Sequence, residues 1–135
     1  MKGVSAIIAT ILLLMITIGL AGTAYVYISG MMTGKMAKAI SVLDASCTNK
    51  NITLVVSNDG QEAIVNSATG SDLKILVNNL DKTSNFYQSG GSSSYTINPR
   101  GVVVLLDNAT GYATGVSHTV LLVSPSNSIT QRIWC

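Results

Sequence analysis

The stretch VSAIIATILLLMITIGLAGTAYVYI, residues 4–28, is the longest apolar run in this chain. No charged residue occurs between Gly3 and Gly34, and Lys2 is the only charge before that run. A helix needs about 20 apolar residues to cross the hydrocarbon core of a bilayer, whereas buried strands are much shorter. The residues therefore predict a long helix that either lies in a membrane or packs among copies of itself.

The helix is expected to cover residues 4–44. Its hydrophobic half is 4–30, and its amphipathic half is 31–44, where apolar residues recur at helical spacing: Met32, Met36, Ala39, Ile40 and Leu43. Small residues, among them Gly19 and Gly22, would let another helix approach closely. An ordinary membrane anchor also contains such residues, so this alternative stays open.

Residues 45–135 show a different pattern, in which apolar residues alternate with polar ones. Residues 52–57 predict a strand, the turn at 58–60 follows, and residues 62–65 are expected to return as its hairpin partner. Further short strands are predicted at 72–77, 95–97, 102–106, 118–123 and 129–134. We therefore predict an α+β protein, with the helix followed by an antiparallel β-sandwich head of the immunoglobulin-like kind.

The chain has two cysteines, Cys47 and Cys135. One lies near the start of the predicted head and the other is the last residue, which favours a disulfide that ties the final strand to the start of the domain. Two unrelated buried thiols are the alternative. An exported location would favour the disulfide, since oxidising compartments preserve it.

Composition argues against several classes of function. The net charge is +2 and only 10% of residues are charged, so no basic face indicates nucleic-acid binding. His118 is the only histidine and lies in a predicted strand, where a structural role is more frequent than that of a general base. No His, Cys or Asp set has the spacing of a metal site. We expect neither catalysis nor a cofactor.

Three models describe the N-terminus. A secretory signal could be cut after Ala24, because Gly22-Thr23-Ala24 supplies small residues, but the helical pattern runs through that site. A permanent anchor requires no cleavage. In the third model the cut falls next to Gly3, where Lys2 and Gly3 directly precede the hydrophobic run.

The third model rests on a resemblance. The sequence from Lys2-Gly3 through VSAIIATILL resembles the N-terminus of archaeal type IV pilins. The resemblance implies a class III signal leader, residues 1–3, in which a prepilin peptidase recognises Lys2 and Gly3 and makes Val4 the new N-terminus. Ala6 stands where many relatives have proline, and Ile8 stands where bacterial pilins have glutamate.

The same resemblance implies a function. The chain would be the structural subunit of an extracellular type IV pilus-like filament on the cell surface that serves adhesion. Its partners would be copies of itself, the prepilin peptidase, the pilus assembly machinery and, before assembly, the membrane. The filament core would be packed by Ile7, Ile11, Leu14, Ile18, Gly19 and Gly22. The alternatives are a membrane-anchored binding module that does not polymerise, or a minor pilin.

Two N-glycosylation sequons occur in the predicted head, at Asn51 and Asn108. Such triplets also arise by chance in a sequence rich in serine, threonine and asparagine. Asn108 lies in a predicted turn and is the better candidate acceptor. Asn51 begins a predicted strand.

Overall fold

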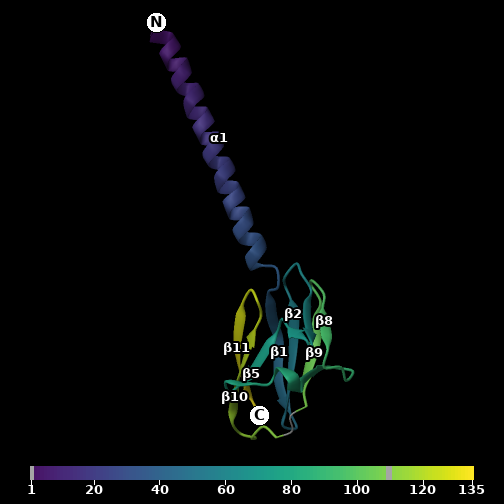
Figure 1. The fold of residues 1–135 in the computed structure, drawn as a ribbon. Helices are drawn as coiled ribbons and strands as arrows, with labels where there is room; N and C mark the ends of the chain where they lie inside the picture. The colour runs from purple at the N-terminus through teal and green to yellow at the C-terminus, as the bar shows by residue number, and fades with distance from the viewer. Residues whose placement is uncertain (1, 109–110) are drawn as a thin grey trace. The chain divides into compact units, whose positions relative to one another are not determined.

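The computed structural model describes residues 2–108 and 111–135 (Figure 1). The chain divides into two compact units, a helical unit that ends at Gly34 and a head domain, Lys35–Cys135. Helix α1, Lys2–Lys35, forms the first unit. Its uninterrupted length agrees with the predicted hydrophobic half, 4–30.

The prediction that the helix continues to residue 44 is wrong. Helix α1 ends at Lys35, and strand β1, Ile40–Thr48, begins within the predicted amphipathic half. The helix ends there because a turn about twenty residues later in the chain forms hydrogen bonds with the backbone between α1 and β1. The amides of Asp59 and Glu62 donate to the carbonyls of Ala39 and Ala37, at 2.9 and 2.7 Å. The head therefore begins at residue 35 and not at 45.

Gly60 permits this close approach of two backbone segments. A Cβ atom at this position would lie 2.4 Å from the carbonyl oxygen of Ala37. Such a contact cannot be relieved by moving a flexible side chain, because the opposing atom belongs to the backbone. Glycine is therefore required where the turn meets the first residues of the head.

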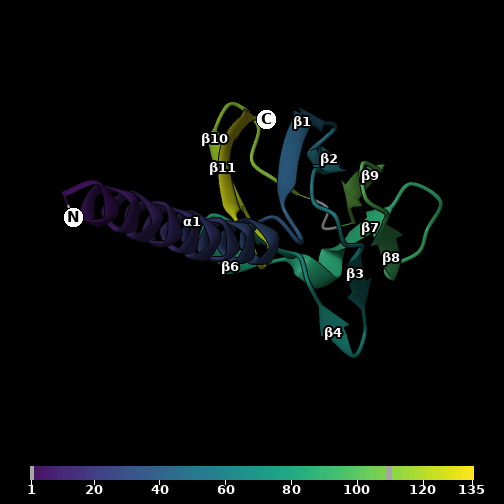
Figure 2. The same cartoon turned by 90° about the horizontal axis from the view of Figure 1, so that it is seen from above.

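The head consists of antiparallel strands in three sheets (Figures 1 and 2). One sheet has the order β1-β2-β9-β7, with β2 Asn51–Asn58, β9 Val102–Asp107 and β7 Phe86–Gln88. The second has the order β11-β10-β5-β6, with β11 Ser128–Trp134, β10 Ser117–Val123, β5 Lys74–Val77 and β6 Leu80–Asp81. The third is β4-β3-β8, with β4 Gly70–Ser71, β3 Ile64–Ser67 and β8 Tyr95–Ile97. The predicted α+β class is thus confirmed.

The pairing of β3 differs from the prediction. Residues 62–65 were expected to form a hairpin with 52–57, but β3 pairs with β4 and β8, while β2 pairs with β1 and β9. The side chain of Asn58 lies at this point and donates from Nδ2 to the carbonyls of Glu62 and Ile97, at 2.8 and 2.9 Å. These bonds direct the chain after β2 away from the sheet β1-β2-β9-β7 and toward the sheet that contains β3.

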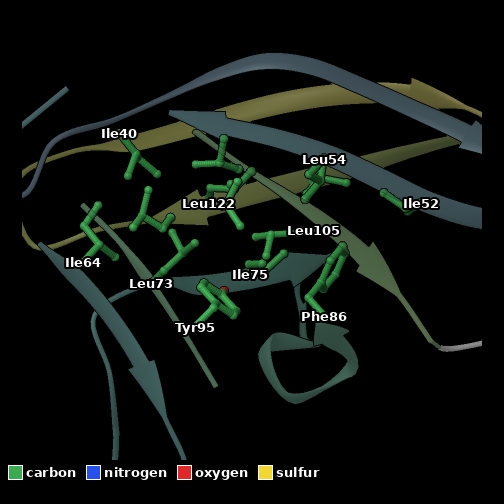
Figure 3. Packing of buried hydrophobic residues seen from close by; sticks show 14 of the residues in the cluster. Ile40, Ile52, Leu54, Ile64, Leu73, Ile75, Phe86, Tyr95, Leu105 and Leu122 are labelled. Carbon is green, nitrogen blue, oxygen red and sulfur yellow. The ribbon is translucent and has the colours of Figure 1, made fainter. Parts of the chain in front are cut away.

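The hydrophobic core lies between the sheets (Figure 3). Strand β10, and strand β2 as far as Val56, bury alternate residues, as the period of two predicts. Leu54, Leu122 and Ile75 are fully buried, and Ile64 and Tyr95 bring the third sheet into the same cluster. Burial of each such side chain contributes about 1.5–3 kcal/mol relative to exposure. The core therefore joins all three sheets.

Candidate functional site: the apolar helix and the pinned edge of the head

The surface of helix α1 is apolar on all sides. From Val4 to Met32, its large apolar side chains are between 45% and 73% exposed. The segment Gly3–Met32 is long and apolar enough to cross a membrane, with a length of about 45 Å at 1.5 Å per residue. An N-terminal helix of this kind is consistent with membrane insertion or with a signal sequence.

The six residues predicted to pack a filament core lie on this helix. Ile7, Ile11, Leu14 and Ile18 are spaced by four, three and four residues, so they share one face. Their exposed fractions are 60%, 52%, 60% and 64%. At Gly19 and Gly22 an added Cβ would meet no described atom within 4 Å. Gly22, four residues after Ile18, lies on this face, whereas Gly19 follows Ile18 directly and points about 100° away from it.

Three threonine hydroxyls of the helix are satisfied within it. Thr10, Thr17 and Thr23 donate to the carbonyls three residues earlier, at 2.8, 2.8 and 3.0 Å. A hydroxyl bonded in this way leaves no unpaired donor in a medium without water. The helix can therefore lie in lipid or among other apolar helices without a polar partner for these threonines.

The predicted processing residues lie at the start of the helix. Lys2, Gly3 and Val4 all fall within α1, while Met1 lies outside the described residues. Peptide groups in the first turn of a helix lack part of the hydrogen bonding of later turns, and glycine weakens a helix by about 1 kcal/mol relative to alanine. Gly3 therefore lies in a turn that is held less firmly than the interior of the helix.

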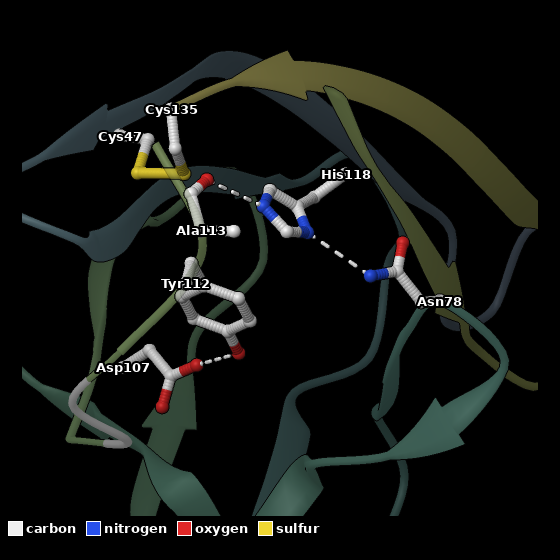
Figure 4. Close-up of a disulfide and its surroundings, with 7 residues drawn as sticks. All are labelled: Cys47, Asn78, Asp107, Tyr112, Ala113, His118 and Cys135. Carbon is white, nitrogen blue, oxygen red and sulfur yellow. Dashed lines mark hydrogen bonds between the residues drawn. A yellow bond between two sulfur atoms is a disulfide. The ribbon is translucent and has the colours of Figure 1, made fainter. Parts of the chain in front are cut away.

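The predicted disulfide is present in the head (Figure 4). Cys47 lies near the end of β1 and Cys135 follows β11, with an S–S distance of 2.04 Å and a Cα–Cα distance of 5.0 Å. The two strands are the edges of different sheets and lie in contact. The bond therefore ties one sheet to the other.

A second connection holds the opposite end of β1. The amide of Ile40 donates to Asn127 Oδ1 at 3.0 Å, and Asn127 Nδ2 donates to the carbonyl of Ile40 at 2.8 Å. Ser124 fixes this asparagine, because its hydroxyl donates to Asn127 Oδ1 at 2.7 Å. The strand that follows the helix is thus held to the second sheet at both ends. The sequence contained no signal for Asn127 beyond its position in a turn.

His118 occupies the strand position that its sequence context predicted. It is 6% exposed and lies on β10. Asn78 Oδ1 accepts from the amide of Thr119 at 3.0 Å, so Asn78 Nδ2 faces His118 Nδ1, 3.0 Å away, as a donor. His118 Nε2 then donates to the carbonyl of Ala113 at 3.1 Å (Figure 4). Nε2 therefore holds Ala113 of the 111–117 segment, while Nδ1 joins the ring to Asn78.

Tyr112 and Asp107 extend this polar cluster (Figure 4). The Tyr112 hydroxyl donates to a carboxylate oxygen of Asp107, and the Tyr112 ring lies edge-on to His118 with centroids 5.2 Å apart. Asp107 is 1% exposed. Burial, followed by the hydrogen bond and charge of Asp107, raises the pKa of the Tyr112 phenol well above its usual value.

This shift predicts a loss of stability in alkali. A phenol whose pKa is higher in the folded chain stabilises the fold below its unfolded pKa of about 10 and loses that contribution as the pH rises further. We expect the free energy of unfolding to fall above about pH 10. Tyr112→Phe should lower it by about 1–3 kcal/mol at neutral pH and reduce the alkaline slope. Chemical denaturation at pH 7 and pH 11 measures the free energy of unfolding of the natural sequence and of Tyr112→Phe. If this free energy falls equally in the two chains between pH 7 and pH 11, Tyr112 is not the cause of the loss.

The two sequons differ in accessibility. Asn51 begins β2, and its Oδ1 is buried without a hydrogen-bond partner among the described residues. Asn108 follows β9 and is exposed, while Ala109 and Thr110 of its sequon lie outside the described residues. Attachment of a glycan at Asn108 would thus displace less of the fold than attachment at Asn51.

Within the described part of the chain, no group of three or more His, Cys, Asp or Glu side chains could hold a metal ion. Comparison of the sequence with known protein-family models and with curated proteins finds no match. The function therefore has to be inferred from the residues themselves.

Proposed function

We propose that this protein is the structural subunit of an extracellular, archaeal-type type IV pilus-like filament. The observation that carries the proposal is the charge-free helix Gly3–Met32, which directly follows Lys2 and precedes one small disulfide-linked head. The role would be structural and not catalytic, with no cofactor and no nucleic acid.

The helix suits transfer between two apolar surroundings. Lipid tails and leucine side chains are similarly apolar, so moving such a helix from a bilayer into a bundle of like helices changes its hydrophobic free energy little. Cleavage after Gly3 by a prepilin peptidase would remove Lys2, the one nearby side chain that resists extraction from the membrane. The protein would thus be inserted in the membrane before assembly and would then move into the filament.

Polymerisation would proceed by contacts that repeat from subunit to subunit. Head-to-tail contacts that do not close into a ring generate a helical polymer. In this arrangement the helices form the filament core, with the face of Ile7, Ile11, Leu14 and Ile18 against neighbours, and the head domains form the outer surface. A surface location would expose the heads to whatever the cell adheres to.

Electron microscopy of surface material tests this function. The chain is expressed with a prepilin peptidase and pilus assembly machinery, and the material sheared from the cells is imaged and probed with antibody to the head. We expect antibody-labelled filaments that disappear when the peptidase is omitted. A chain that stays in the membrane fraction and extracts as a monomer would favour the anchored binding module instead.

A further inference from the structure

Two open pockets lined mostly by polar residues lie next to each other on the head domain. Their volumes are about 480 and 420 Å³, and both are lined by Ser84 and Ser93. They surround η1, Thr83–Asn85, and are bordered by β3, β7 and the loop at 89–94. They share two lining side chains, and we call the two adjacent pockets together the η1 groove.

The η1 groove is lined by neutral hydrogen-bonding groups. Serine and threonine hydroxyls and asparagine amides predominate, with one carboxylate, Asp81, and one aromatic ring, Tyr87. None of its lining residues within the described chain is basic. A phosphate or another anion would find no counter-charge among these lining residues, and Ala68 and Tyr87 are the side chains among them that offer an apolar contact. The lining suits a neutral ligand rich in hydroxyl groups.

Several polar groups of the η1 groove are held in place. Asp81 Oδ1 accepts from the amide of Thr83 at 2.9 Å and from its hydroxyl at 2.6 Å. These bonds lower the pKa of the Asp81 carboxyl, so it remains an ionised acceptor. Neither bond uses Oδ2, which leaves that oxygen for a ligand hydroxyl. A charged acceptor of this kind forms stronger hydrogen bonds than a neutral one.

The far end of the η1 groove combines a ring with open space. Tyr87 lies half-buried on the edge strand β7, and Gly91, with φ of +92°, has no described atom within 4 Å of an added Cβ. The amide of Asn108 donates to the carbonyl of Asn85 at 2.9 Å, which brings these two asparagines together at the rim. That bond joins backbone groups, and the side-chain amides of the two asparagines beside the Tyr87 ring offer polar contacts next to an apolar face.

We propose that the η1 groove binds a neutral saccharide. One sugar ring lies on Tyr87 with its hydroxyls bonded to Asn85 and Asn108, and the next ring of the saccharide bonds to Asp81. The saccharide can come from outside the protein or from a glycan attached at Asn108 itself, since the chemistry is the same. The proposal concerns the head alone and does not depend on polymerisation.

Titration of the full chain in lipid nanodiscs tests the external source. Protein made in a host without N-glycosylation is titrated with maltotriose, mannotriose and chitotriose, and binding is followed by saturation-transfer NMR. We expect one of these sugars to bind. Tyr87→Ala should weaken binding by about tenfold. Ser93→Trp, at an exposed position that lines both cavities, should abolish it without disturbing the core.

The matched control is Trp134→Ala, which removes an exposed aromatic side chain outside the η1 groove. It should leave binding unchanged, and equal losses in Trp134→Ala and Tyr87→Ala would overturn the proposal. If no free sugar binds, chain glycosylated at Asn108 is examined for NMR contacts between glycan protons and the Tyr87 ring. Contacts there would support the attached glycan as the ligand. Absence of both signals would refute the saccharide site.

Discussion

Ile11→Asp is expected to abolish filament assembly while the head domain stays folded. Ile11 lies on the face that α1 would present to neighbouring helices, and its side chain is 52% exposed. A carboxylate costs about 3 kcal/mol at the centre of a membrane-spanning helix and less toward its ends, and Ile11 lies in the first third of the segment Gly3–Met32. In a bundle, each subunit would carry the same charge. Electron microscopy of the sheared fraction should show no filaments, and Leu14→Asp should behave in the same way.

Two controls separate assembly from folding and insertion. Ile11→Leu keeps the volume and apolarity of the position and should assemble normally. Carbonate extraction reports whether Ile11→Asp still enters the membrane, and an intact disulfide reports a folded head. Normal numbers of filaments from Ile11→Asp would show that this helix face is not in the filament core.

Removal of the disulfide should cost about 4–5 kcal/mol of unfolding free energy. The bond joins residues separated by 88 positions, and in the chain-entropy model a loop of that length restricts the unfolded chain by about this amount. Typical domains are stable by about 5–15 kcal/mol, so the loss is a large fraction. The bond also holds β1 to β11, which no backbone ladder joins in the described residues.

The measurement compares the full chain with the variant Cys47→Ser/Cys135→Ser by denaturant unfolding. The double variant is used because a single substitution would leave one free thiol. Untreated and reduced samples of the natural sequence provide the control, since reduction should lower the midpoint by a similar amount. A difference below about 1 kcal/mol would mean that the Asn127 contacts to Ile40 suffice to hold the strand.

Local patterns predicted much of the fold. The charge-free run predicted the helix, and alternation predicted β2, β9 and β10 with small errors at their ends. The end of the helix could not be predicted in this way, because Ile40 and Leu43 fit a helical spacing by coincidence. The carbonyls of Ala37 and Ala39 accept hydrogen bonds from the turn at 59–62, about twenty positions later in the chain. A local pattern does not contain these contacts.

In the head too, features with a local sequence pattern could be predicted, and contacts between distant residues could not. The two cysteines predicted their own bond, since no other pairing was available within the chain. The contacts of Asn78 with His118 and of Asn127 with Ile40 span 40 and 87 positions and have no local pattern. Asn78 has a positive φ of 51°. Asparagine tolerates this backbone conformation, but the pair Asn78-Asn79 does not by itself predict it.

Intact mass and N-terminal sequencing of the protein sheared from the cell surface test the filament proposal most directly. We predict a chain that begins at Val4 and is two hydrogen atoms lighter than its reduced form, as one disulfide requires. A chain that begins at Met1 and stays in the membrane fraction would contradict the proposal in favour of an anchored binding module. A soluble chain that begins at Tyr25 would show that the helix is a secretory signal.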